Sequence, residues 1–160
     1  GKVMVRDKNI MYIFCEVINQ LEPESILDIG MFFKSIGGVS RQILGIEISD
    51  SIYITGVDTD KTNGLNVYSR VYNKIISKNG ICEDKQRCYQ DINQQVKKYD
   101  LAILLSDLVG IGDKEQLIKN IEDKARYMLM YNEDIKYLAY NHNSVDISLD
   151  DVKCKLVLLD

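Results

Sequence analysis

The sequence predicts an α/β domain with a three-layer, doubly wound, mostly parallel sheet of about six strands and helices on both faces. Two observations lead to this fold class. Short apolar runs, of the kind that form strands buried on both faces, alternate with longer segments whose apolar residues recur at helical spacing. A single proline, Pro23, and the lack of repeats or Gly/Ser-rich tracts give no sign of a linker, so a single domain is expected over residues 1–160.

The segments up to residue 58 have the order helix, strand, helix, strand. Residues 11–21 are amphipathic and are predicted to form a helix that ends at the Glu22-Pro23-Glu24 break. Residues 25–30 are a short apolar run closed by glycine, which is typical of a buried strand in a parallel sheet. Residues 39–48 are predicted to be helical, and the β-branched run 52–58 to be the next strand. The last three segments therefore form one β-α-β unit.

The rest of the chain continues this alternation, with its clearest buried strand at residues 99–107. Helices are predicted at residues 65–77, 114–124 and 133–141. Further strands are predicted at residues 87–89, 126–131 and 154–159. The domain then divides into an N-terminal helix (1–24), a core (25–131) and a C-terminal helix and strand (132–160). In such sheets, ligands bind at the carboxyl ends of the strands, where the strand order reverses.

The charge pattern argues against nucleic acid and membrane partners. The net charge is −4, and 24 acidic and 20 basic residues are interspersed, with no basic cluster larger than Lys97-Lys98. No apolar run approaches the roughly 18 residues of a membrane helix, and no leader precedes the first helix. We therefore expect a cytoplasmic protein that acts on a small-molecule substrate or a protein partner. The ten tyrosines would suit an interface, including one between copies of the chain.

The cysteine and histidine content argues against disulfides and metals. Four cysteines, at positions 15, 82, 88 and 154, are few for a disulfide scaffold, so buried free thiols are expected. The only histidine is His142, in a polar turn, and no second cysteine pair completes a set of four zinc ligands. No metal is expected, and His142 is interpreted as a surface residue.

Four short motifs occur at the predicted strands. They are Leu27-Asp28-Ile29-Gly30, Gly56-Val57-Asp58, Tyr89-Gln90-Asp91-Ile92 and Tyr99-Asp100-Leu101-Ala102-Ile103-Leu104. In this order, over about residues 25–131, the chain resembles the Rossmann-like core of class I S-adenosylmethionine-dependent methyltransferases. The resemblance implies a Rossmann-like fold, S-adenosylmethionine as the cofactor, and transfer of its methyl group. We expect a small molecule as the methyl acceptor.

The resemblance also implies cofactor-binding residues. Asp58 would accept the ribose hydroxyls, Asp91 would lie near the adenine, and Asp28 and Gly30 would begin the cofactor loop, where glycine lets the backbone approach the ligand closely. For each of these aspartates, the alternative is a capping role at a strand end or helix start.

Residues after the 99–107 run are candidates for the chemistry. The resemblance places Ser106 and Asp107 where the family often has catalytic or substrate-contacting residues. An aspartate after an apolar strand can act as a general base if it is partly desolvated. The alternative is that both residues cap a loop.

The glycine-rich motif is degenerate. The family's Asp-x-Gly-x-Gly-x-Gly becomes Asp28-Ile29-Gly30-Met31-Phe32-Phe33-Lys34, so Phe32 and Lys34 stand at the second and third glycine positions. A phenyl ring there would occupy the space of the cofactor's methionine or ribose unless the loop takes another path, which Gly37 and Gly38 can supply. Arg41 and Gln42 follow; they are interpreted either as an anion site near a helix start or as a solvated helix face.

Three functions remain open. The chain is a methyltransferase, or an inactive methyltransferase-fold module for protein interaction or assembly whose pocket is filled by Phe32 or Phe33, or a nucleotide or nicotinamide dinucleotide binder. The last is disfavoured because no Gly-x-Gly-x-x-Gly follows the first strand. The family also closes its sheet with a reversed final hairpin, whereas only one last strand, 154–159, is predicted. An open cleft beneath Gly30 would favour an enzyme.

Overall fold

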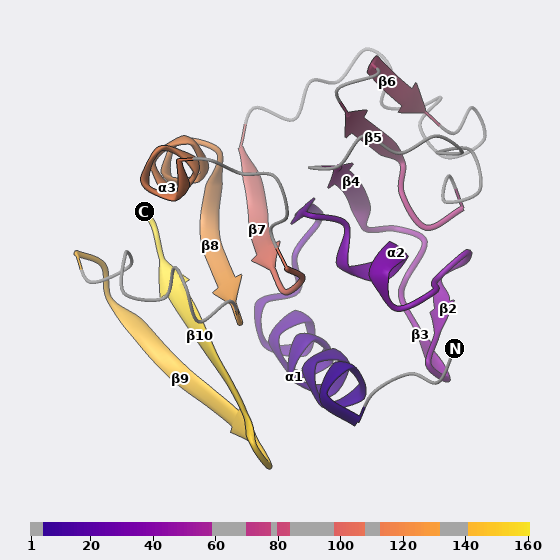
Figure 1. Cartoon of the computed structure of the whole chain (residues 1–160), viewed down its shortest axis with the longest axis horizontal. Helices are drawn as coiled ribbons and strands as arrows, with labels where there is room; N and C mark the ends of the chain where they lie inside the picture. Colours follow the sequence, from indigo (N-terminus) through magenta and orange to yellow (C-terminus); the bar gives the residue numbers. More distant parts are fainter. Residues whose placement is uncertain (1–4, 59–69, 78–79, 84–97, 108–112, 132–140) are drawn as a thin grey trace.

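The fold was analysed in a computed structural model, which describes residues 5–58, 70–77, 80–83, 98–107, 113–131 and 141–160 (Figure 1). Eight strands form one sheet in the order β6-β5-β4-β1-β7-β8-β10-β9. The parallel strands are β5 (Lys74–Ser77), β4 (Tyr53–Val57), β1 (Ser25–Ile29), β7 (Tyr99–Leu104) and β8 (Ala125–Met130). The antiparallel additions are β6 (Gly80–Glu83), β10 (Val152–Leu158) and β9 (Ser144–Leu149). The predicted doubly wound, mostly parallel sheet is confirmed, with more strands than expected.

The strand order reverses beside β1. From β1 the chain continues outward on one side to β4 and β5, and then returns to the other side to form β7 and β8. The topological switch point therefore lies at the carboxyl ends of β1 and β7, which are neighbours in the sheet.

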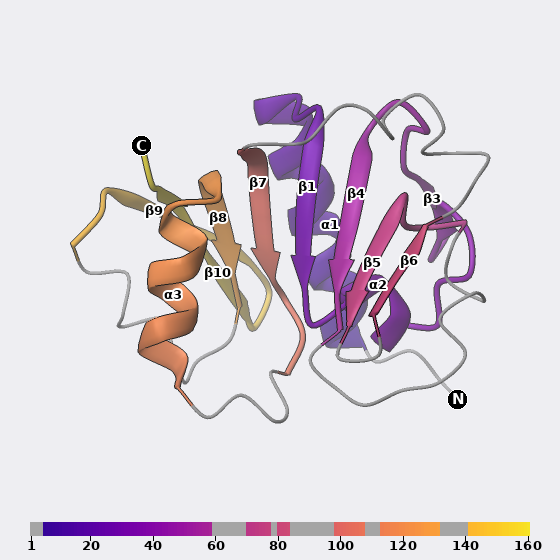
Figure 2. The same ribbon diagram turned by 90° about the horizontal axis from the view of Figure 1, so that it is seen from above.

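Helices cover both faces of the sheet, as predicted (Figure 2). On one face α1 (Val5–Leu21) buries an apolar stripe, Ile10, Met11, Ile13, Phe14 and Val17, against the larger core cluster. On the other face α3 (Lys114–Glu122) buries Ile118 and Ile121. The side chain of Asp113 begins α3 by accepting a hydrogen bond from the Gln116 N–H.

Strand β1 is buried along its whole length, which explains its continuous apolar run. Successive side chains point to opposite faces, so Ile26 joins the α1 cluster while Leu27 and Ile29 join the α3 cluster. By the same alternation, Asp28 points to the α1 side, where its hydrogen-bond partners lie.

The segment after β1 differs from the prediction. Residues 39–48 are not helical; the chain makes the one-turn helix α2 (Phe32–Ser35) and then a hairpin of β2 (Gln42–Ile43) and β3 (Ile46–Glu47). Leu44 and Gly45 both have positive φ, 52° and 78°, as a two-residue type I′ turn requires. The helix predicted at 65–77 is also wrong where the structure describes it, because residues 74–77 form β5.

The C-terminal hairpin corrects a second expectation. The strand predicted at 154–159 is β10, and β9 pairs with it antiparallel, so the reversed final hairpin is present. The strand β9 alternates Val145, Ile147 and Leu149 with polar residues, a pattern of period two that the prediction overlooked. The predicted strand 87–89 and nearly all of the predicted helix 133–141 lie outside the described residues.

Two further observations concern the described part of the chain. Cys15 is a free thiol whose pKa is raised by burial, and Cys154 is buried in the core. None of its helices is long and apolar enough to cross a membrane.

Candidate active site

Three predicted site residues meet at the carboxyl edge of the sheet. The register pairs Ile29 with Val57, so Gly30 and Asp58 follow neighbouring strands, and the Gly30 N–H donates to the Val57 carbonyl at 2.8 Å. The Ser106 hydroxyl, just after β7, donates to the Gly30 carbonyl at 3.0 Å. The ends of β1, β4 and β7 are thus joined around Gly30. The predicted adenine residue, Asp91, lies outside the described residues.

The loop after β1 turns sharply at two left-handed residues, Gly30 with φ of 83° and Met31 with φ of 51°. Such a backbone is costly for methionine, so packing must hold it in place. The Met31 side chain is buried against β4, where a Cβ atom on Gly56 would come within 3.1 Å of the Met31 Cγ. The glycine in Gly56-Val57-Asp58 therefore makes room for the loop.

The Asp28 carboxylate fixes the backbone of this loop through hydrogen bonds. Its carboxylate is fully buried and accepts hydrogen bonds from the Phe32 N–H at 2.9 Å and the Tyr72 hydroxyl at 2.6 Å, with the Phe33 N–H at 3.5 Å. Burial raises the pKa of Asp28 to about 6, and these donors oppose the rise. The pKa of Tyr72 is raised well above its usual value by burial and by Asp28. The geometry makes Asp28 a positioning residue for the loop, which agrees with the capping role given above as the alternative. The cofactor contact that the resemblance implies for Asp28 stays a prediction.

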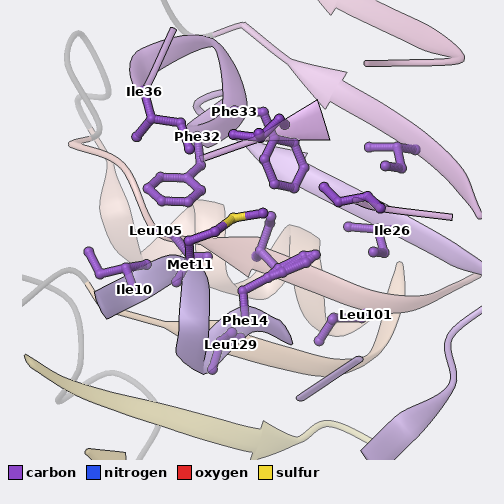
Figure 3. Close-up of a cluster of buried hydrophobic side chains, with 14 of the residues drawn as sticks. Ile10, Met11, Phe14, Ile26, Phe32, Phe33, Ile36, Leu101, Leu105 and Leu129 are labelled. Carbon is purple, nitrogen blue, oxygen red and sulfur yellow. The ribbon is translucent and has the colours of Figure 1, made fainter. Parts of the chain in front are cut away.

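The two phenylalanines of the loop point into the core. Figure 3 shows the rings of Phe32 and Phe33 beside Met11 and Phe14 of α1. The centroid of the Phe33 ring lies 5.4 Å from that of Phe14, 5.9 Å from that of Phe32 and 6.0 Å from that of Tyr72. Both rings are buried in the α1 cluster.

Lys34 contacts Asp58 across the edge. Its Nζ lies 3.3 Å from the Asp58 Oδ2, and the two side chains are 21% and 5% exposed. The Asp58 N–H donates to the Ile76 carbonyl of β5, which fixes the backbone that carries the carboxylate. In the sequence, Lys34 was noted only because it replaces a glycine of the motif. Its contact with Asp58 spans 24 positions, and no local sequence pattern indicates such a contact.

Arg41 has a structural role, and both predicted interpretations of it are wrong. Its guanidinium is buried and donates to the Val71 carbonyl at 3.0 Å, the Ile52 carbonyl at 2.7 Å and the Asn73 Oδ1 at 2.7 Å. It also donates to the Ser49 carbonyl. The β2–β3 hairpin is thereby joined to the segments that enter β4 and β5.

The remaining candidates lie around this edge or away from it. Gly37 has a φ of 80° and its N–H donates to the Lys34 carbonyl, so it ends α2. Asp107 is exposed beside Ser106. His142 is partly buried, and its Nε2 lies 3.0 Å from the Glu122 Oε1 at the end of α3. A groove of about 820 Å³, which Glu24, Tyr53 and Asp100 help to line, opens at the opposite, amino edge and is not the predicted site.

The sequence matches no protein-family model and no curated protein. Solved structures are similar to it in fold. A Staphylococcus aureus protein described as a caffeoyl-CoA O-methyltransferase superposes with a TM-score of 0.52 at 13% identity, covering 98% of this chain and 86% of its own. A Nostoc punctiforme protein described as an O-methyltransferase gives 0.54 at 15% identity, covering 96% and 56%. A Klebsiella pneumoniae protein described in the same way gives 0.50 at 10% identity, covering 99% and 81%.

These similarities agree with the observed strand order. The parallel strands diverge from β1, and a reversed hairpin closes the sheet beside β8. At such low identities the likeness shows the fold alone. The chain has the Rossmann-like fold of the class I methyltransferases.

Proposed function

We propose that this chain is an S-adenosylmethionine-dependent methyltransferase that methylates a hydroxyl group of a small molecule. The observation that carries the proposal is the convergence of Gly30, Asp58 and Ser106 at the topological switch point, with both loop phenylalanines turned into the core. The hydroxyl acceptor is inferred from the fold neighbours described as O-methyltransferases.

The residues at the edge fit this cofactor. Asp58 offers a carboxylate to the ribose hydroxyls, and the backbone at Gly30 carries no side chain that would block a close approach. When bound, S-adenosylmethionine supplies an electrophilic methyl group on a sulfonium. The protein's contribution is then mainly to position the acceptor, which can supply much of the rate acceleration.

Ser106 and Asp107 have different proposed tasks. The Ser106 hydroxyl already donates to the Gly30 carbonyl, so we assign it to positioning the loop. Asp107 is exposed at the edge, and we assign it the general-base role on the condition that a bound acceptor desolvates its carboxylate. The net charge of −4 supports an acceptor other than nucleic acid, and we place the reaction in the cytoplasm.

The alternative of an inactive interaction module required Phe32 or Phe33 to fill the pocket. Both rings are buried with α1 residues, and the fold neighbours are described as O-methyltransferases, so we favour the enzyme over this alternative. A dinucleotide binder still lacks its glycine pattern after β1.

Isothermal titration with S-adenosylmethionine and S-adenosylhomocysteine tests the proposal. We expect saturable binding that is lost in Asp58→Ala and kept in Asp146→Ala, a matched change at an exposed aspartate of β9. Formation of S-adenosylhomocysteine with a panel of phenols, catechols and aliphatic alcohols would then identify the acceptor. The absence of heat at ligand concentrations of roughly 1 mM, the upper end of ordinary enzyme affinities, would overturn the proposal.

A further inference from the structure

We propose that Lys34 is a specificity-determining residue that controls access to Asp58: its ammonium occupies the carboxylate in the free site, and a ribose binds by displacing it. The inference rests on the proposed function, because it concerns the same site. It gives a role to the lysine that stands at the third glycine position of the loop: this lysine lowers the affinity of the site for the cofactor.

The first support is geometric. Lys34 lies on α2, directly after the turn at Gly30 and Met31, and its Nζ is 3.3 Å from the Asp58 Oδ2. The Asp58 side chain is 5% exposed. A ribose that approaches from the carboxyl edge therefore meets the ammonium at the oxygen it needs.

The second support is the strength of the competing contacts. The Lys34 ammonium and the Asp58 carboxylate carry opposite charges, so they attract each other in addition to forming a hydrogen bond. Ribose hydroxyls are neutral donors and offer the carboxylate hydrogen bonds only. Partial burial also weakens solvent screening of the pair. Ribose binding thus gives up the attraction between the two charges, which lowers cofactor affinity.

The lysine is able to leave. About a fifth of its side chain, 21%, is exposed, and four methylene groups separate the ammonium from the backbone. The displaced ammonium can regain hydration at the edge without any movement of α2. The helix itself is held by the Phe32 N–H bond to Asp28 and by the Ser35 hydroxyl bond to the Phe32 carbonyl, so the exchange involves a side chain only.

The test is a titration of four proteins with S-adenosylhomocysteine. Lys34→Met removes the charge and keeps the apolar stem; it is expected to bind roughly tenfold more tightly than the wild type, since one charged contact no longer competes. Lys34→Arg restores a cation and is expected to bind like the wild type. Lys98→Met is the matched control, because Lys98 pairs with Asp160 at the amino edge of the sheet. Its affinity is expected to be unchanged.

The outcomes separate the two proposals. If the wild type binds and Lys34→Met binds equally or more weakly, the gating inference is overturned and the proposed function stands. If Lys34→Met binds and the wild type does not, the gating inference is supported and the proposed function of the wild-type chain falls. If no protein binds, both fall. Thermal unfolding checks that each variant is folded, and Lys34→Gln replaces Lys34→Met if the latter is not; its expected affinity lies between those of the wild type and Lys34→Met.

Discussion

The carboxyl ends of β1 and β4 each carry an aspartate, but the two residues do different things. Asp28 lies within β1 and points toward α1, where it is fully buried among the donors of the loop and Tyr72. Asp58 lies one residue past β4 and faces the edge, where its partner is Lys34 on a flexible stem. The register pairs Asp28 with Gly56, so Asp58 lies two positions further along. The carboxylate within the sheet organises the loop, and the carboxylate past its edge pairs with Lys34.

The register of the sheet connects these two regions. Asp28 is opposite Gly56 on β4, and the Tyr72 ring lies over Gly56, which brings its hydroxyl to Asp28. A substitution at Gly56 on β4 is therefore expected to affect the loop after β1. The following predictions test whether the buried and the edge aspartate are as different as their surroundings indicate.

Asp28→Ala is expected to cause the largest loss of stability. It removes the acceptor of the Phe32 N–H and the Tyr72 hydroxyl, and each buried donor left unsatisfied costs about 1–3 kcal/mol. We expect the free energy of unfolding, measured in urea, to fall by about 3–5 kcal/mol. Asp58→Ala is the comparison and is expected to cost about 1 kcal/mol, because the freed Lys34 can turn to solvent. Equal losses would contradict the distinction.

The stability contributed by Asp28 is expected to depend on pH. Its pKa is about 6 in the folded protein and about 4 in the unfolded chain, so the folded state binds the proton more tightly. The stabilisation is complete below about pH 4 and is lost as the pH rises through 6. Relative to Asp28→Asn, the wild type should lose about 3 kcal/mol of unfolding free energy from about pH 4 to about pH 7.

Urea titrations of both proteins at several pH values measure this difference. A difference that does not change with pH would show that burial does not raise the pKa of Asp28.

Gly56→Ala is expected to have a smaller effect that reaches both regions. The added Cβ would lie 2.9 Å from two atoms of the buried Tyr72 ring, and overpacking of this kind costs roughly 1–3 kcal/mol. Gly37→Ala, where a Cβ meets nothing within 4 Å but φ is 80°, should cost about 1 kcal/mol from backbone strain alone. Thermal unfolding compares the two variants; a larger shift for Gly37→Ala would refute close packing at Gly56.

Four of the five parallel strands were predictable because they appear in the sequence as short apolar runs; the fifth, β5, was predicted as a helix. The strands β1, β4, β7 and β8 were all located from such runs within a few residues. The strand β9 was overlooked because it is an edge strand in which apolar residues alternate with exposed serine and aspartate. The hairpin β2–β3 was overlooked because Leu44-Gly45 is not a common type I′ pair.

The site was only partly predictable. Sequence order placed Gly30, Asp58 and Ser106 at strand ends, and sheet topology then brought them together. The partners Tyr72 and Lys34 depend on contacts across 44 and 24 positions, which no local pattern encodes. The role of Tyr72 was also missed because the prediction placed this residue in a helix over 65–77.

The buried guanidinium of Arg41 has a consequence for the dynamics of the chain. Its donors bind carbonyl oxygens in the segment leading to β4 and in residues 71–73, which precede β5. If either segment opened alone, buried hydrogen bonds to a charged group would be broken without replacement. The hairpin and the two strand entrances therefore open as one cooperative unit, so this flank of the sheet unfolds all together or not at all.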